Sequence, residues 1–137
     1  MDVNNLKFPV LCFNQGLTIK CKNVEELTTC TKTGLKNGYF KNLQIVDSSN
    51  KLYKVKETKK IKGVGLLWGY NIFLNQKILV DLIFHDKVQD ILFEEVKNKV
   101  LNSSKSIQLW ETREGFDEFK NKIASTKNIN ELANLIK

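Results

Sequence analysis

Residues 43–62, LQIVDSSNKLYKVKETKKIK, decide the expected architecture of this chain. Two strand-like runs, Leu43 to Asp47 and Leu52 to Ile61, flank Ser48-Ser49-Asn50, and Ser and Asn are residues that favour turns. A turn this short joins neighbouring antiparallel strands. The stretch therefore predicts a long hairpin and, with it, an antiparallel sheet.

A second hairpin and a helix are predicted upstream. Pro9 to Phe13 and Leu17 to Cys21 are strand-like runs on either side of Asn14-Gln15-Gly16. Asn23 then supplies a helix N-cap, with Glu26 at the third helical position. Apolar residues recur at helical spacing up to Cys30, so we expect one to three helical turns, ended by Gly34 or Gly38.

Downstream, Tyr70 to Leu74 and Ile78 to Phe84 are expected to form another hairpin across Asn75-Gln76. Residues on both faces of the run from Ile78 to Phe84 are mostly apolar. That pattern predicts a central strand covered on both sides.

The remainder of the chain is predicted to be mainly helical. A 3.6-residue apolar period begins near Asp86 and ends near Asn102, which predicts a helix there. Ile107 to Trp110 is a further strand candidate. Thr112 is expected to cap the next helix, and Asn128-Ile129-Asn130-Glu131 resembles the capping box of a last one.

The fold class expected from this order is α+β, with a mainly antiparallel sheet, helices packed against it and a helical C-terminal third. At 137 residues the whole chain, 1–137, fits a single domain that can bury a sizeable core.

Composition indicates a soluble cytoplasmic protein. The N-terminus lacks a basic region followed by a long apolar run, and the most apolar stretch, Leu66 to Phe84, is interrupted by Asn71, Lys77 and Asp81. We therefore expect neither export nor a membrane span. Three Cys nine residues apart and a single His make a zinc site unexpected and favour free thiols.

The positive charge is concentrated in the strand-rich part. Residues 1–62 hold 12 Lys against 5 acidic residues, whereas residues 63–137 hold 10 Lys plus Arg against 10 acidic residues. The first part thus carries the whole net charge of +7.

A row of lysines is predicted on the second strand of the long hairpin. If alternation is regular there, Lys54, Lys56, Lys60 and Lys62 share one face, at intervals of about 6.6 Å between alternate residues. Such a row can attract phosphates or an acidic protein surface. The alternative is a solvated edge strand that Lys protects from aggregation.

Catalytic and cofactor chemistry finds little support in the sequence. Gly63-Val64-Gly65 and Gly69 superficially resemble a dinucleotide loop, but a hairpin rather than a helix N-terminus is expected after them. His85 could serve as a general base, yet no nucleophile or second His accompanies it. We expect no cofactor, no metal and no catalytic residue.

Two stretches of the chain are similar to a known family in their residue pattern and in chain length, although they contain no diagnostic motif. The Lys-rich hairpin leads into GVGLLWGYNIFLNQKILVDL, residues 63–82, and the tail contains FDEFKNKIAS, residues 116–125, and NINELANLIK, residues 128–137. These stretches resemble small immunity proteins of bacterial polymorphic and contact-dependent toxin systems. The resemblance implies a cytosolic, non-enzymatic protein that binds a cognate toxin domain and blocks it.

The leading hypothesis is therefore an immunity-type protein that binds a protein partner, a toxin domain with an acidic face. Its expected contact residues are Lys54, Lys56, Lys60 and Lys62, with Tyr53 and Trp68 as aromatic anchors. A nucleic-acid-associated accessory domain that uses the same lysines is the alternative. A small enzyme centred on His85 is the third hypothesis.

Overall fold

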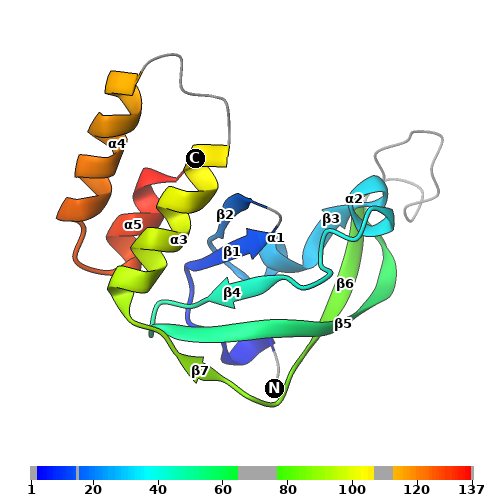
Figure 1. Cartoon of the computed structure of the whole chain (residues 1–137). Helices are drawn as coiled ribbons and strands as arrows, with labels where there is room; N and C mark the ends of the chain where they lie inside the picture. The colour runs from blue at the N-terminus through cyan, green and yellow to red at the C-terminus, as the bar shows by residue number, and fades with distance from the viewer. Residues whose placement is uncertain (1–2, 15, 65–76, 107–112, 137) are drawn as a thin grey trace.

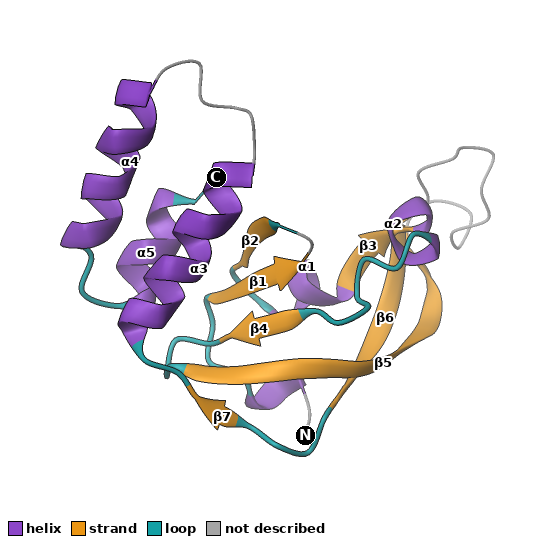
Figure 2. Cartoon of the chain, viewed as in Figure 1, coloured by secondary structure: helices purple, strands orange, loops and turns teal. Residues whose placement is uncertain are grey.

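A computed structural model describes residues 3–14, 16–64, 77–106 and 113–136. The described strands form one curled antiparallel sheet, and helices pack against it (Figures 1 and 2). The predicted α+β class is confirmed. The strands are β1 Val10–Asn14, β2 Leu17–Cys21, β3 Thr29–Thr31, β4 Gln44–Val46, β5 Lys51–Val64, β6 Lys77–Phe84 and β7 Gln89–Asp90. The helices are η1 Val3–Asn5, α1 Val24–Thr28, α2 Lys32–Lys36, α3 Phe93–Ser106, α4 Arg113–Ser125 and α5 Ile129–Leu135.

The sheet follows the order β2-β1-β4-β5-β6-β3, with β7 added beside the start of β5. Two of the predicted hairpins have both of their strands among the described residues, and both hairpins are present. β1 pairs with β2, and β4 pairs with β5. The turn between β4 and β5 uses Asn50 at a φ of 60°, a left-handed conformation that Asn tolerates well. The expected strands at Tyr70 to Leu74 and Ile107 to Trp110 lie outside the described residues.

Alternation along the strands separates two cores. On β1, Val10 and Cys12 point into the core enclosed by the curl of the sheet, whereas Leu11 points to the opposite face. That opposite face is covered by α3, α4 and α5, which lie together on one side of the sheet (Figure 2). The helix-side core contains Leu11, Val46, Leu52, Ile91, Val96, Val100, Ile123, Ile129, Leu132, Ala133 and Ile136.

The caps predicted for the short helices are confirmed. The side chain of Asn23 accepts a hydrogen bond from the backbone N of Glu26 at 2.8 Å, and α1 begins at Val24. In the same way Asn128 accepts from Glu131 N at 2.9 Å, and α5 begins next. The helix after Asn23 has the expected length of one to three turns, but it ends at Thr28 rather than at Gly34 or Gly38, because Cys30 lies in β3, which pairs with the edge of β6.

The helix expected at Asp86 begins only at α3. After β6 the chain stays extended alongside β5: His85 N donates to Lys54 O at 2.9 Å, and β7 pairs with Lys51 and Leu52. The start of β5 offers an unpaired edge, and pairing with that edge prevails over the helical period of the segment. The predicted helix start was therefore wrong by seven residues, and Leu92, an apolar residue of the 3.6-residue period from Asp86, is 70% exposed.

β6 is internal to the sheet as predicted, because β5 and β3 flank it. Its alternate residues from Ile78 to Phe84 are buried in the curl, but Leu79 and Ile83 on the second face are only half-buried. The expected cover on both faces is thus incomplete. Among the described helices, none combines the length and apolarity that crossing a bilayer requires.

Candidate functional site

The basic part of β5 projects from the helix-covered part of the sheet. Leu52 contacts the helix-side core, and Lys54, two residues further on the same face, is exposed. Lys56, Lys59 and Lys60 are exposed as well. We call Lys54–Lys60 the basic segment. Within the described part of the chain, none of its lysines forms an ion pair.

Pairing on the other edge of β5 ends where the basic segment begins. β4 pairs with β5 from Leu52 to Lys54, and Val55 N donates to Leu43 O at 3.0 Å. Beyond that point β5 pairs only with β6 among the described strands (Figure 1). From Lys56 onward the basic segment therefore has one edge without a partner among the described strands, which is consistent with the expected placement of Lys on a sheet edge.

The pairing of β5 with β6 contains two shifts of register, and these shifts decide which lysines of β5 lie on the same face. Val55 pairs with Phe84 but Glu57 pairs with Ile83, so one extra residue is accommodated at Lys56. Lys59 then pairs with the exposed Asp81, and Lys60 with the buried Val80. Paired residues point to the same side of a sheet, so Lys60 lies on the side of Val80, which belongs to the core within the curl, whereas Lys54 lies on the side of Leu52, which belongs to the helix-side core. Lys54 and Lys60 therefore do not share one face, and the prediction of a common face is wrong for this pair.

The second irregularity lies between Lys60 and Lys62, and Lys62 pairs with Leu79. The side chain of Lys62 lies outside the described residues. Ile61, the extra residue at this point, is 57% exposed. The basic segment thus presents charge on both of its faces, and the exposed apolar side chain of Ile61 follows directly after it.

Tyr53 and Trp68 were the two expected aromatic anchors, and the structure describes only Tyr53. Tyr53 is only 6% exposed: its ring contacts Phe84 at 5.8 Å between centroids, and its hydroxyl lies 3.4 Å from Asp47 Oδ2. It belongs to the core within the curl, so the prediction of an exposed anchor is wrong. Trp68 lies outside the described residues.

His85, the residue on which an enzyme hypothesis depends, is exposed directly after β6. Asp86 beside it is also exposed and caps no helix. Within the described ranges, no group of three or more His, Cys, Asp or Glu could hold a metal ion. Cys12 and Cys21 are buried and Cys30 is half-buried, and all three are free thiols.

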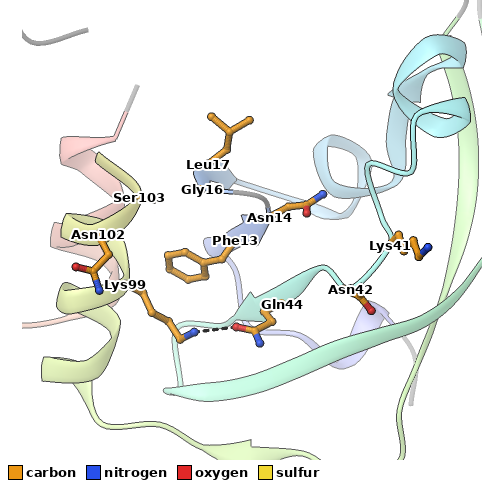
Figure 3. A pocket seen from close by; sticks show the side chains of 10 residues that line it. All are labelled: Phe13, Asn14, Gly16, Leu17, Lys41, Asn42, Gln44, Lys99, Asn102 and Ser103. Carbon is orange, nitrogen blue, oxygen red and sulfur yellow. Dashed lines mark hydrogen bonds between the residues drawn. The ribbon is translucent and has the colours of Figure 1, made fainter. Parts of the chain in front are cut away.

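An open groove of about 730 Å³ lies between the β1–β2 hairpin, the start of β4 and α3 (Figure 3). Its lining contains lysines and side-chain amides but no acidic residue. The lining residues are Phe13, Asn14, Gly16, Leu17, Lys41, Asn42, Gln44, Lys99, Asn102 and Ser103. Sequence reasoning did not predict this site, because isolated Lys, Asn and Gln in different elements carry no motif.

Two residues of the groove lining, Phe13 and Gln44, belong to a row of residues across four strands. Register places Thr18 opposite Phe13, Phe13 opposite Gln44, and Gln44 opposite Lys54. Opposite residues lie on one face, with Cβ atoms about 5 Å apart. The row connects the groove directly to the basic segment through the pair of Gln44 and Lys54.

Helix α3 closes the groove against this row. The hydroxyls of Thr18 and Ser103 are hydrogen-bonded to each other. Lys99 Nζ donates to Gln44 Oε1 at 2.8 Å and lies 5.7 Å from the centroid of the Phe13 ring (Figure 3). Lys99 as a residue is half-buried, and the partners found for its ammonium in the described structure are neutral.

Comparison of this chain with protein-family models, with curated proteins and with solved structures finds no match.

Proposed function

We propose that this chain is a protein-binding protein of the immunity type, which binds a bacterial toxin domain and blocks it. The observation that carries the proposal is the basic segment of β5. Four exposed lysines stand there on a sheet edge, and within the described structure none of them has an ion-pair partner. A partner with an acidic face would find lysines on β5 that form no ion pair within the described structure.

Electrostatics gives such a segment a defined role in binding. Exposed charges of one sign accelerate the encounter with an oppositely charged surface and disfavour partners of like charge. They contribute less to final affinity, because exposed ion pairs are each worth about 1 kcal/mol or less. Ile61 offers apolar area beside the charges, which a protein partner can cover.

The structure of the segment favours a protein over a nucleic acid. Lys54 and Lys60 lie on opposite faces of β5, so the described lysines do not form one row that follows a phosphate backbone. Tyr53 is buried and offers no ring on which a base could stack. Arg113 is the only Arg in the chain, and Arg is the preferred residue for bidentate contacts to phosphates and bases.

The test is a charge reversal of the basic segment. A toxin domain encoded beside this chain would be co-expressed with the wild-type protein and with a variant that carries Lys54→Glu, Lys56→Glu, Lys59→Glu and Lys60→Glu. We expect the wild-type protein to relieve toxicity and to bind the domain. The variant should bind with an association rate at least about tenfold lower at low salt.

A matched control carries Lys→Glu at four exposed positions elsewhere and thus makes the same change of net charge. These positions are Lys22, Lys87, Lys120 and Lys127. If both variants bind equally well, the basic segment is not the contact surface. If the wild-type protein ignores the toxin domain and instead binds any duplex with an affinity that falls steeply with salt, the nucleic-acid alternative replaces this proposal.

A further inference from the structure

The groove beside α3 contains an ammonium group, that of Lys99, for which few hydrogen-bond acceptors are found. Lys99 Nζ has three N–H donors, and the interactions found for it are the bond to Gln44 Oε1 and the contact with the Phe13 ring. No carboxylate lies within ion-pair distance of Lys99 among the described residues. A half-buried cation with neutral partners attracts an anion more strongly than a fully hydrated surface lysine does.

The orientation of the Gln44 amide follows from the same hydrogen bond. Lys can only donate, so the Gln44 atom that faces Lys99 must be the oxygen. The amide nitrogen, with two further donors, is then on the other branch of the same side chain (Figure 3). No described residue accepts from it. Lys99 and Gln44 together therefore present neighbouring donors of an ammonium and an amide.

The positive charge of the groove is not balanced by its lining. Lys41 and Lys99 line the groove, and Lys54 is the cross-strand neighbour of Gln44. The lining contains no Asp or Glu. The ring of Phe13 lies beside the donors, and the half-exposed Leu17 lies at the end of the hairpin (Figure 3). The groove thus combines anion-binding donors with apolar area.

We infer that this groove binds a small organic carboxylate that carries an apolar group. One carboxylate oxygen accepts from Lys99 Nζ and the other accepts from the amide nitrogen of Gln44, while the apolar group packs on Phe13. A carboxylate fits better than a phosphate, because Lys99 and Gln44 together supply one positive charge and two donor groups, which match the single charge and two oxygens of a carboxylate. The volume of about 730 Å³ is within the range of small-molecule sites.

The probe is 3-phenylpropionate, titrated into the isotope-labelled full chain and followed by amide chemical shifts. We expect saturable shifts at Phe13, Asn14, Gln44 and Lys99, including the side-chain amide of Gln44. The neutral analogue 3-phenylpropanamide should bind about tenfold more weakly or worse, because it removes a charge-assisted hydrogen bond. Inorganic phosphate, added at the same concentrations, should not produce these shifts.

Lys99→Met should weaken binding of 3-phenylpropionate by about tenfold, whereas Lys59→Met, a matched loss of one lysine far from the groove lining, should not. Gln44→Glu is a second variant that does not depend on the first. Its carboxylate would pair with Lys99 inside the chain, so it should abolish binding of the probe without lowering the melting temperature.

Three results would overturn the inference. These are equal affinity for the acid and its amide, an equal loss in the Lys59 variant, and shifts that are spread over the surface rather than confined to the groove. The outcome is independent of the toxin-binding test, because the probe is a small molecule and both of its key variants leave the basic segment unchanged.

Discussion

Asp47 Oδ1 accepts two hydrogen bonds from Ser49, one from its backbone N at 2.9 Å and one from its hydroxyl at 2.6 Å. The same carboxylate accepts from Lys51 N and, across 40 residues of chain, from Lys7 N, both at 3.2 Å. Asp47 is only 1% exposed. It therefore organises the turn that joins β4 to β5, and ties the N-terminal segment to that turn.

Replacement of this carboxylate should be costly. Asp47→Ala leaves several buried or half-buried N–H donors without an acceptor, so we expect a loss of about 2–4 kcal/mol in the free energy of unfolding. Denaturant titration measures the loss. The exposed Asp86→Ala is the matched control and should change stability by about 0.5 kcal/mol or less. Equal effects of the two changes would contradict the role given to Asp47.

The helix layer depends on the residues that it buries against the sheet. Leu132 on α5 is 0% exposed in the helix-side core, so Leu132→Ala should lower the free energy of unfolding by about 2–5 kcal/mol. Leu92 just before α3 is 70% exposed, and Leu92→Ala should be nearly neutral. Thermal melts of both variants test the packing. A comparable loss at Leu92 would mean that the period beginning at Asp86 does form a buried helix face.

Alkaline pH should destabilise the fold through two tyrosines. Desolvation raises the pKa of Tyr39, and repulsion from the thiolate forms of the neighbouring cysteines raises it further. Desolvation followed by repulsion from Asp47 raises the pKa of Tyr53. Both raised pKa values mean that the folded state holds its protons more tightly than the unfolded state does. Stability is therefore unaffected below the ordinary tyrosine pKa of 10.0 and declines as the pH rises above it.

The measurement is the free energy of unfolding between pH 9 and about 11.5, with tyrosinate absorbance as a second readout. The double variant Tyr39→Phe, Tyr53→Phe removes both groups and should show a shallower decline with pH than the wild-type protein. An identical decline in the two proteins would refute the assignment.

Thiol reactivity should distinguish the three cysteines. Cys12 and Cys21 are 1% and 4% exposed, and a hydrogen bond with Cys21 together with burial raises the pKa of Cys12. Cys30 is half-buried, and desolvation raises its pKa. We expect one thiol, Cys30, to react slowly with an aromatic disulfide reagent in the native state and all three to react after denaturation. Cys30→Ser should abolish the native reaction, and rapid labelling of two or more thiols in the folded protein would contradict the buried positions.

Local chemistry was sufficient to predict much of the fold. The β1–β2 hairpin, the long hairpin of β4 and β5 and the caps at Asn23 and Asn128 follow from alternation, turn residues and side-chain oxygens within a few positions. The charge asymmetry is also a property of the sequence alone. These features need no knowledge of distant segments, because each is decided by contacts between near neighbours in the chain.

The tertiary structure decided what the local pattern left open. The start of α3 at Phe93, the burial of Tyr53 and the faces of Lys59 and Lys60 depend on which edge each strand meets and in which register. A bulge adds one residue and reverses the alternation after it, and single-sequence periodicity does not show where a partner strand will require one. For the same reason the sequence determined that β5 is basic, whereas only folding brought Lys99 of α3 to Gln44 of β4, 55 residues away.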